Sequence, residues 1–135
     1  MPVLVAYRPD QYGQAALERG LLEASLRGAS VVVVNASTGS SYVDKAYASV
    51  RQIEQVERAL RASEVPGEVR QVIGTDVADV VLEVAGEVEA ALLIVGIRHR
   101  SPVGKLLLGS TAQRLLLDSE CPVLAVKPGA GDSDA

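Results

Sequence analysis

The chain alternates between two hydrophobic patterns, and the alternation predicts strands and helices in turn. Short segments that are apolar almost throughout are typical of strands buried on both faces of a sheet, and they occur at residues 2–7, 30–35, 91–96 and 122–126. A further strand is expected at 68–74, with Val69 and either Val72 or Ile73 pointing inward. Between these strands, apolar residues at helical spacing predict helices over about 14–27, 43–60, 77–84 and 110–118.

Turn and cap residues mark where several of these elements begin or end. Pro9, Asp10 and Gly13 predict a turn before the first helix, and Gly28 is placed to end that helix. Thr75 or Asp76 is expected to cap the third helix, since both side chains can accept a hydrogen bond from a free N–H group.

Strands that alternate with helices predict βαβ units, which build a parallel sheet covered by helices on both faces. We therefore expect a single doubly wound α/β domain over residues 1–127. Residues 128–135 have too little apolar surface to pack and are expected to form a flexible tail. Ligands in such sheets bind outside the carboxyl ends of the strands, where the strand order reverses.

Charge and composition narrow the class of protein. The net charge of −4 argues against a nucleic-acid partner, because a phosphate backbone is bound by clustered lysines and arginines. No stretch approaches the roughly 18 apolar residues of a membrane span, and no charged-then-apolar leader opens the chain. The single cysteine, Cys121, is expected to be a buried structural thiol, and one histidine offers no metal cluster. Together these features predict a cytoplasmic protein.

The segment GIRHRSPVGKLLLGS, residues 96–110, has the features that hold a phosphate group. Glycines let the backbone approach an anion, and the start of a helix adds free N–H groups and a partial positive charge. The glycines are Gly96, Gly104 and Gly109, the helix opens at Ser110 and Thr111, and the cations are Arg98, Arg100 and Lys105. A purely structural connection is the alternative, because Ser110 and Gln113 also form a capping-box pattern.

Other nucleotide and catalytic motifs are absent from the sequence. A Walker A loop is excluded by His99 and Leu106 at its required positions, and no G-x-G-x-x-G follows the first strand. There is no G-x-S-x-G elbow and no evident pair of nucleophile and base. Asp10 is a weak candidate for the magnesium carboxylate that ATP hydrolysis requires. We therefore assign no catalytic residue and no metal ligand, and leave weak ATPase activity as the last alternative.

The loop and the segment QRLLLDSECPVLAVK after it resemble the universal stress protein family, and the likeness extends over residues 2 to 127. ATP-binding members carry Gly, two residues, Gly, nine residues and Gly-Ser or Gly-Thr; this chain has Gly96, His99 and Gly109-Ser110 at those positions. The resemblance implies a flavodoxin-like sheet with strand order 3-2-1-4-5. It also implies a homodimer joined through the last strand, from Pro122 to Val126.

Two positions depart from the family pattern. His99 replaces the motif's second glycine, and Arg8 stands where the family's first strand ends in an aspartate that contacts the nucleoside. Both side chains can donate to phosphate, and arginine does so bidentately. The departures therefore fit either an altered choice of ligand or the loss of nucleotide binding.

The resulting prediction is a stress-response protein that binds an adenine nucleotide, with ATP, accompanied by magnesium, as the first ligand to test. The residues predicted to bind it are Ala6, Arg8, Ala36, Val95, Gly96, Arg98, His99, Gly109, Ser110 and Thr111. The alternative is a member of the same family that binds no nucleotide and acts as a dimeric protein-interaction module.

Overall fold

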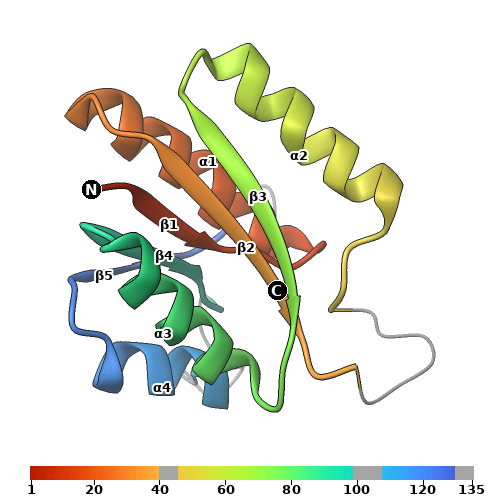
Figure 1. Ribbon diagram of the computed structural model, residues 1–135, viewed down its shortest axis with the longest axis vertical. Helices are drawn as coiled ribbons and strands as arrows, with labels where there is room; N and C mark the ends of the chain where they lie inside the picture. Colours follow the sequence, from red (N-terminus) through yellow and green to blue (C-terminus); the bar gives the residue numbers. More distant parts are fainter. Residues whose placement is uncertain (40–45, 99–107, 130–135) are drawn as a thin grey trace.

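The computed structural model describes residues 1–39, 46–98 and 108–129. They form a parallel sheet of five strands in the order β3-β2-β1-β4-β5, as expected. The strands are β1 (Val3–Ala6), β2 (Val31–Ser37), β3 (Gly67–Ile73), β4 (Leu92–Gly96) and β5 (Val123–Val126). The helices between them are α1 (Gln11–Arg27), α2 (Val50–Ser63), α3 (Val77–Val88) and α4 (Ser110–Asp118) (Figure 1).

The sheet is the middle of three layers. Because successive strand residues point to opposite faces, Val5 and Ile94 pack with α1 and α2, whereas Leu4 and Leu93 pack with α3 and α4. Figure 1 shows α3 and α4 side by side on their face. No helix in the described ranges is long and apolar enough to cross a membrane.

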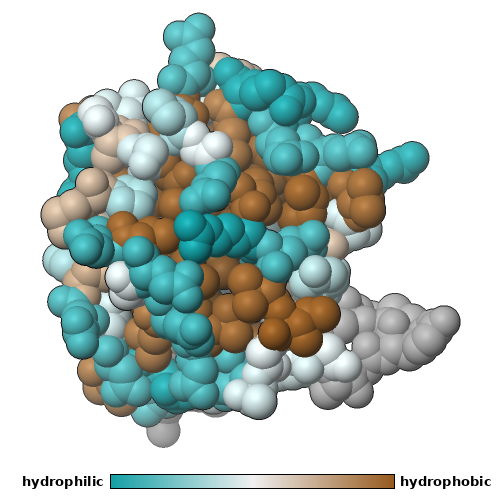
Figure 2. Space-filling model, in the orientation of Figure 1, coloured by the Kyte–Doolittle hydropathy of each residue, from teal (hydrophilic) through white to brown (hydrophobic). Residues whose placement is uncertain are grey.

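The edge strand β3 is less buried than the central strands. Val69 and Val72 are half-buried on opposite faces, and the Ile73 side chain is exposed. The expectation for Val69 and Val72 is thus met, and Ile73 does not point inward. Figure 2 shows apolar surface interrupted by polar side chains on the face that this view presents.

Helix α1 begins at Gln11, three residues earlier than expected. The prediction was wrong because Asp10 caps the helix: its Oδ1 accepts hydrogen bonds from the N–H groups of Tyr12 at 3.0 Å and Gly13 at 2.9 Å. Gly13 is therefore inside the helix and not in a turn. A side chain there would lie 1.8 Å from the Arg8 carbonyl oxygen, so close packing requires glycine at this position.

Helix α2 begins at Val50 and not near residue 43. Ser49 and Gln52 form a reciprocal capping box, with the Ser49 N–H donating to Gln52 Oε1 at 2.8 Å and the Gln52 N–H donating to Ser49 Oγ at 3.2 Å. Tyr47 precedes the helix, and Val43 lies outside the described residues.

Two further expectations concern Asp76 and Cys121. Asp76 does cap α3, accepting from the Asp79 N–H at 3.1 Å. Both aspartates also form ion pairs with Arg114 of α4, at 3.2 Å and 2.7 Å. Cys121 is half-buried and not fully buried, in a turn where its N–H donates to Ser119 Oγ at 3.2 Å.

Candidate functional site

A cavity of about 370 Å³ opens where β2, β1 and β4 end. Pockets for small molecules start at roughly this size. Its apolar lining comes mainly from the sheet and from the helices on the α3 and α4 face, and includes Ala6, Val34, Ala36, Ala46, Val77, Val81, Val95, Ile97, Ala112 and Leu115. The first residues of α1 and of α4 complete the lining, so the cavity lies at the carboxyl edge where a doubly wound sheet binds its ligand.

Every predicted site residue in the described part of the chain lines this cavity. These residues are Ala6, Arg8, Ala36, Val95, Gly96, Arg98, Gly109, Ser110 and Thr111. The fold thus brings together the ends of three strands and the start of a helix from distant parts of the sequence. His99, Arg100, Gly104 and Lys105 lie outside the described residues.

The N-terminus of α4 forms one side of the cavity, and no side chain of the described residues caps it. Gly109 is the N-cap residue, and the first helical hydrogen bond runs from the Gln113 N–H to the Gly109 carbonyl oxygen at 3.0 Å. Ser110 is the first residue of the helix, so the predicted capping box between Ser110 and Gln113 is wrong. The first N–H groups of a helix have no partner within it and attract an anion, and this first turn carries no acidic residue.

The two described glycines of the loop motif have different surroundings. A Cβ atom at Gly96 would lie 2.2 Å from the Tyr12 carbonyl oxygen, so the packing of β4 against the start of α1 requires glycine. A Cβ atom at Gly109 would meet none of the described residues within 4 Å, and the φ of −64° suits any residue. Packing and backbone conformation explain Gly96, and they leave Gly109 unexplained.

Arg8 lies beyond the end of β1 and is held by Asp10. Arg8 Nε is 3.2 Å from Asp10 Oδ2, while Asp10 Oδ1 accepts the two N–H groups at the start of α1. The two Nη groups of Arg8 have no partner within the part of the chain that the structure describes. Asp10 is thereby committed to the α1 cap and to Arg8. Among the described residues there is no group of histidine, cysteine, aspartate or glutamate side chains that could hold a metal ion.

The buried side-chain amide of Asn35 holds the cavity wall in place near the end of β2. Asn35 is fully buried, and its Nδ2 donates to the carbonyl oxygens of Tyr7 at 2.9 Å and Ala46 at 2.8 Å. Its Oδ1 accepts from the Ala48 N–H at 2.8 Å and from Gln71 Nε2 at 3.1 Å. Tyr7 and Ala46 line the cavity, so Asn35 positions part of the wall without contacting the space itself.

Tyr7 is a residue of this site whose pKa is shifted by its surroundings. Its residue is 8% exposed, and burial, followed by the negative charge of Asp10, raises the pKa of its hydroxyl above 10.0. The phenol is therefore neutral at physiological pH.

Tyr12, Gly13 and Ala46 also line the cavity and were not predicted as site residues. Asp10, considered above only as a weak candidate for a magnesium carboxylate, lines it as well. Aspartate before a helical pattern is a cap signal, and it was obscured here by the neighbouring Pro9 and Gly13. The hydrogen bonds of Asn35 could also have been expected from the sequence. Asn35 follows a run of four valines in a buried strand, and a buried amide needs hydrogen-bond partners.

Comparisons of the sequence and of the structure with known proteins all point to one family. The model of the universal stress protein family matches residues 1–127. A universal stress protein of Mycolicibacterium smegmatis is 48% identical over 126 residues, which cover 93% of this chain and 97% of that protein. The solved structure of a universal stress protein from Archaeoglobus fulgidus is similar with a TM-score of 0.79 and 29% identity, over 94% of this chain and 98% of that chain. The universal stress protein of the same organism in complex with dAMP gives a TM-score of 0.74 and 25% identity, again over 94% and 98%.

Proposed function

The chain belongs to the universal stress protein family, and from this premise we propose that it binds an adenine nucleotide in the cavity at the carboxyl edge of its sheet. The observation that carries the proposal is the start of α4, which no side chain in the described ranges caps and where no described residue crowds Gly109 beside the cavity. A phosphate group needs that combination of free N–H groups, a partial positive charge and room for close approach. The similar protein that was solved with dAMP supports adenine as the base.

The phosphates are expected at Gly96 and at Gly109 to Thr111, because the helix start attracts negative charge. The base is expected against the apolar end of the cavity, at Val34, Ala36 and Ala46. ATP with magnesium is the first ligand to test. The metal would come with the phosphates, since Asp10 is already paired with Arg8 and with the α1 N–H groups.

Nucleotide binding is proposed to regulate partner affinity in the cytoplasm and not to drive chemistry. A homodimer through β5 is part of the same proposal, because β5 lies at the edge of the sheet and pairs only with β4 in the described structure. An unpaired edge strand is open to pairing with another chain. Sedimentation of the protein with and without nucleotide measures this, and a monomer throughout would contradict the dimer.

The test of nucleotide binding is Gly109→Asp, which separates binding from folding. Aspartate is a favourable N-cap with the φ and ψ that Gly109 already has. We expect the variant to be as stable as the native protein or about 0.5–1 kcal/mol more stable. It should nevertheless lose nucleotide binding, because its carboxylate takes the N–H groups and repels the phosphate.

Gly86→Asp is the matched control. A Cβ atom at Gly86 would also lie more than 4 Å from every described neighbour, but this residue lies on α3 and does not line the cavity. Calorimetric titration of ATP, ADP and AMP, with and without magnesium, should give binding to the native protein and to Gly86→Asp only. Absence of heat with the native protein at millimolar nucleotide would refute the proposal, as would retention of binding by a folded Gly109→Asp.

His99→Gly is a second variant, because it restores the family's glycine. If ATP affinity rises strongly in this variant while AMP affinity is unchanged, the histidine is what limits access of the longer phosphate chain. If the variant binds ATP and AMP with the same affinities as the native protein does, His99 has no such effect.

A further inference from the structure

The order of the strands fixes the order of side chains along the cavity. Strand β1 lies between β2 and β4, with Ala6 level with both Val34 and Val95. Adjacent strands are about 4.8 Å apart, so the ends of β2 and β4 are separated by roughly 10 Å. Arg8, two residues beyond Ala6, is therefore placed between the apolar end of the cavity and the end that contains Gly96 and the start of α4.

This placement relates Arg8 to the middle of a nucleotide. If the base lies toward Ala36 and the 5′-phosphate toward Gly109, the ribose lies over the end of β1. That step rests on the proposed function. Arg8 then faces the ribose, whose hydroxyl groups are hydrogen-bond donors as well as acceptors, whereas a guanidinium can only donate.

The contacts of Arg8 favour an anionic group at this position. Asp10 Oδ2 holds Arg8 Nε at 3.2 Å, and Asp10 is itself fixed by the N–H groups of Tyr12 and Gly13. The guanidinium is thus tethered on one side, and its two Nη groups have no partner among the described residues. Two such groups present the geometry that binds a phosphate bidentately.

We infer that Arg8 makes this cavity selective for adenine nucleotides that carry a phosphate on the ribose, at its 2′ or 3′ oxygen. The 5′-phosphate occupies the start of α4, and the second phosphate pairs with Arg8. A plain 5′-nucleotide leaves the Nη groups of Arg8 in water and loses this contact. The selective feature is the second phosphate, and the two ribose positions that could supply it are separate arms of the test.

The experiment compares three ligands by calorimetry: adenosine 5′-monophosphate, adenosine 2′,5′-bisphosphate and adenosine 3′,5′-bisphosphate. The native protein should bind one bisphosphate at least about tenfold more tightly than the monophosphate, the size of one added charged hydrogen-bonding contact. The preferred isomer identifies the ribose oxygen that faces Arg8. Arg8→Gln keeps a long polar side chain and removes its charge, and should reduce this ratio to near one.

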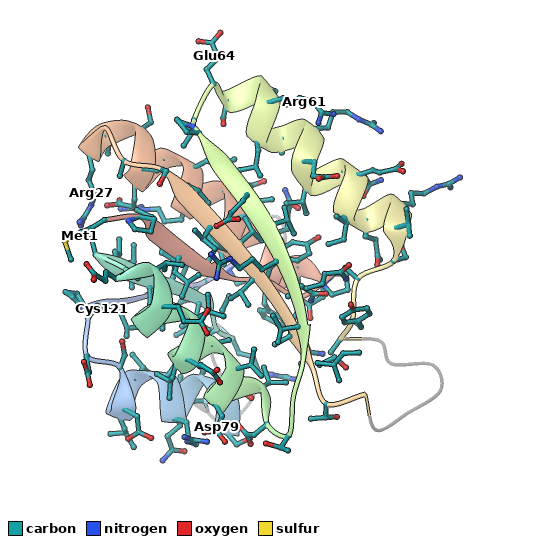
Figure 3. All side chains as sticks on the ribbon, in the orientation of Figure 1. Met1, Arg27, Arg61, Glu64, Asp79 and Cys121 are labelled. Carbon is teal, nitrogen blue, oxygen red and sulfur yellow. The ribbon has the colours of Figure 1, made fainter. Side chains whose placement is uncertain are left out.

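Arg61→Gln is the control for net charge. Arg61 is exposed on α2, and Figure 3 shows it at the opposite end of the molecule from Asp79 at the start of α3. Its substitution should leave the ratio unchanged. Equal affinity of the native protein for all three ligands would overturn the inference and leave the proposed function intact. If none of the three binds, the inference fails, and titration with ATP, ADP and magnesium then decides whether the proposed function fails as well. A ratio that survives in Arg8→Gln would also overturn the assignment to Arg8.

Discussion

Replacing Asn35 by alanine tests whether one buried amide organises the carboxyl edge of the sheet. The substitution removes the partner of three backbone groups: the carbonyl oxygens of Tyr7 and Ala46 and the N–H group of Ala48. The bonds to Tyr7 and Ala48 are buried, and the bond to Ala46 is partly buried. A buried polar group that loses its partner costs about 1–3 kcal/mol, so the free energy of unfolding should fall by about 4 kcal/mol.

A loss of this size is large for a domain whose free energy of unfolding is of order 5–15 kcal/mol. Urea denaturation followed by far-UV circular dichroism measures it, since the chain contains no tryptophan. Gln71→Ala is the matched control: its amide also joins the network, but the residue is exposed and water can replace its bonds. We expect a loss below about 1 kcal/mol there. A loss under about 1.5 kcal/mol for Asn35→Ala, or equal losses in both variants, would refute the reasoning.

The remaining predictions concern packing, capping and ionisation. Gly13→Ala places a Cβ atom 1.8 Å from the Arg8 carbonyl oxygen and should lower stability by about 1–3 kcal/mol in thermal unfolding; a variant as stable as the native protein would contradict this contact. Asp76→Ala should cost about 1 kcal/mol, chiefly through the lost cap and less through the exposed pair with Arg114. Asp76→Asn keeps the cap and should restore most of that stability, so an equal loss in both would exclude capping as the cause. Burial raises the folded-state pKa of Tyr7 above 10.0, so the native protein should keep its stability below about pH 10 and lose part of it as the pH rises further. Urea midpoints across that range should decline less steeply for Tyr7→Phe, and parallel declines would show that Tyr7 is not responsible.

The fold could be predicted because four of its five strands are short runs rich in valine and leucine, which are typical of a sheet covered on both faces. Helix starts were harder to predict, since they depend on single side chains. Asp10 and Ser49 decide where α1 and α2 begin, and each lies next to residues that suggest another boundary. Gly13 indicates a turn by its type, yet it lies inside the helix that Asp10 caps, and it must be glycine because the Arg8 carbonyl oxygen lies against it.

The position of the candidate site followed from general rules, because strand ends and a glycine loop point to one edge of the sheet. The side of the cavity that the start of α1 forms could not be predicted in this way. Tyr12 reaches the cavity because the start of α1 packs close to the end of β4, and no spacing in the sequence encodes that distance. The role of Ser110 was similarly undetermined, since the S-T-A-Q pattern fits a cap whereas the backbone places the cap at Gly109.

The close approach of Gly96 to Tyr12 has a consequence for the history of the chain. Gly96 has a structural reason to remain glycine even if no ligand binds, because any side chain would meet the Tyr12 carbonyl oxygen. Gly109 has no such reason and would be free to vary once binding ceased. Among descendants of a nucleotide-binding ancestor, the residue at position 109 would therefore record the loss of the ligand, while the glycine at position 96 would persist as an inherited feature of the packing.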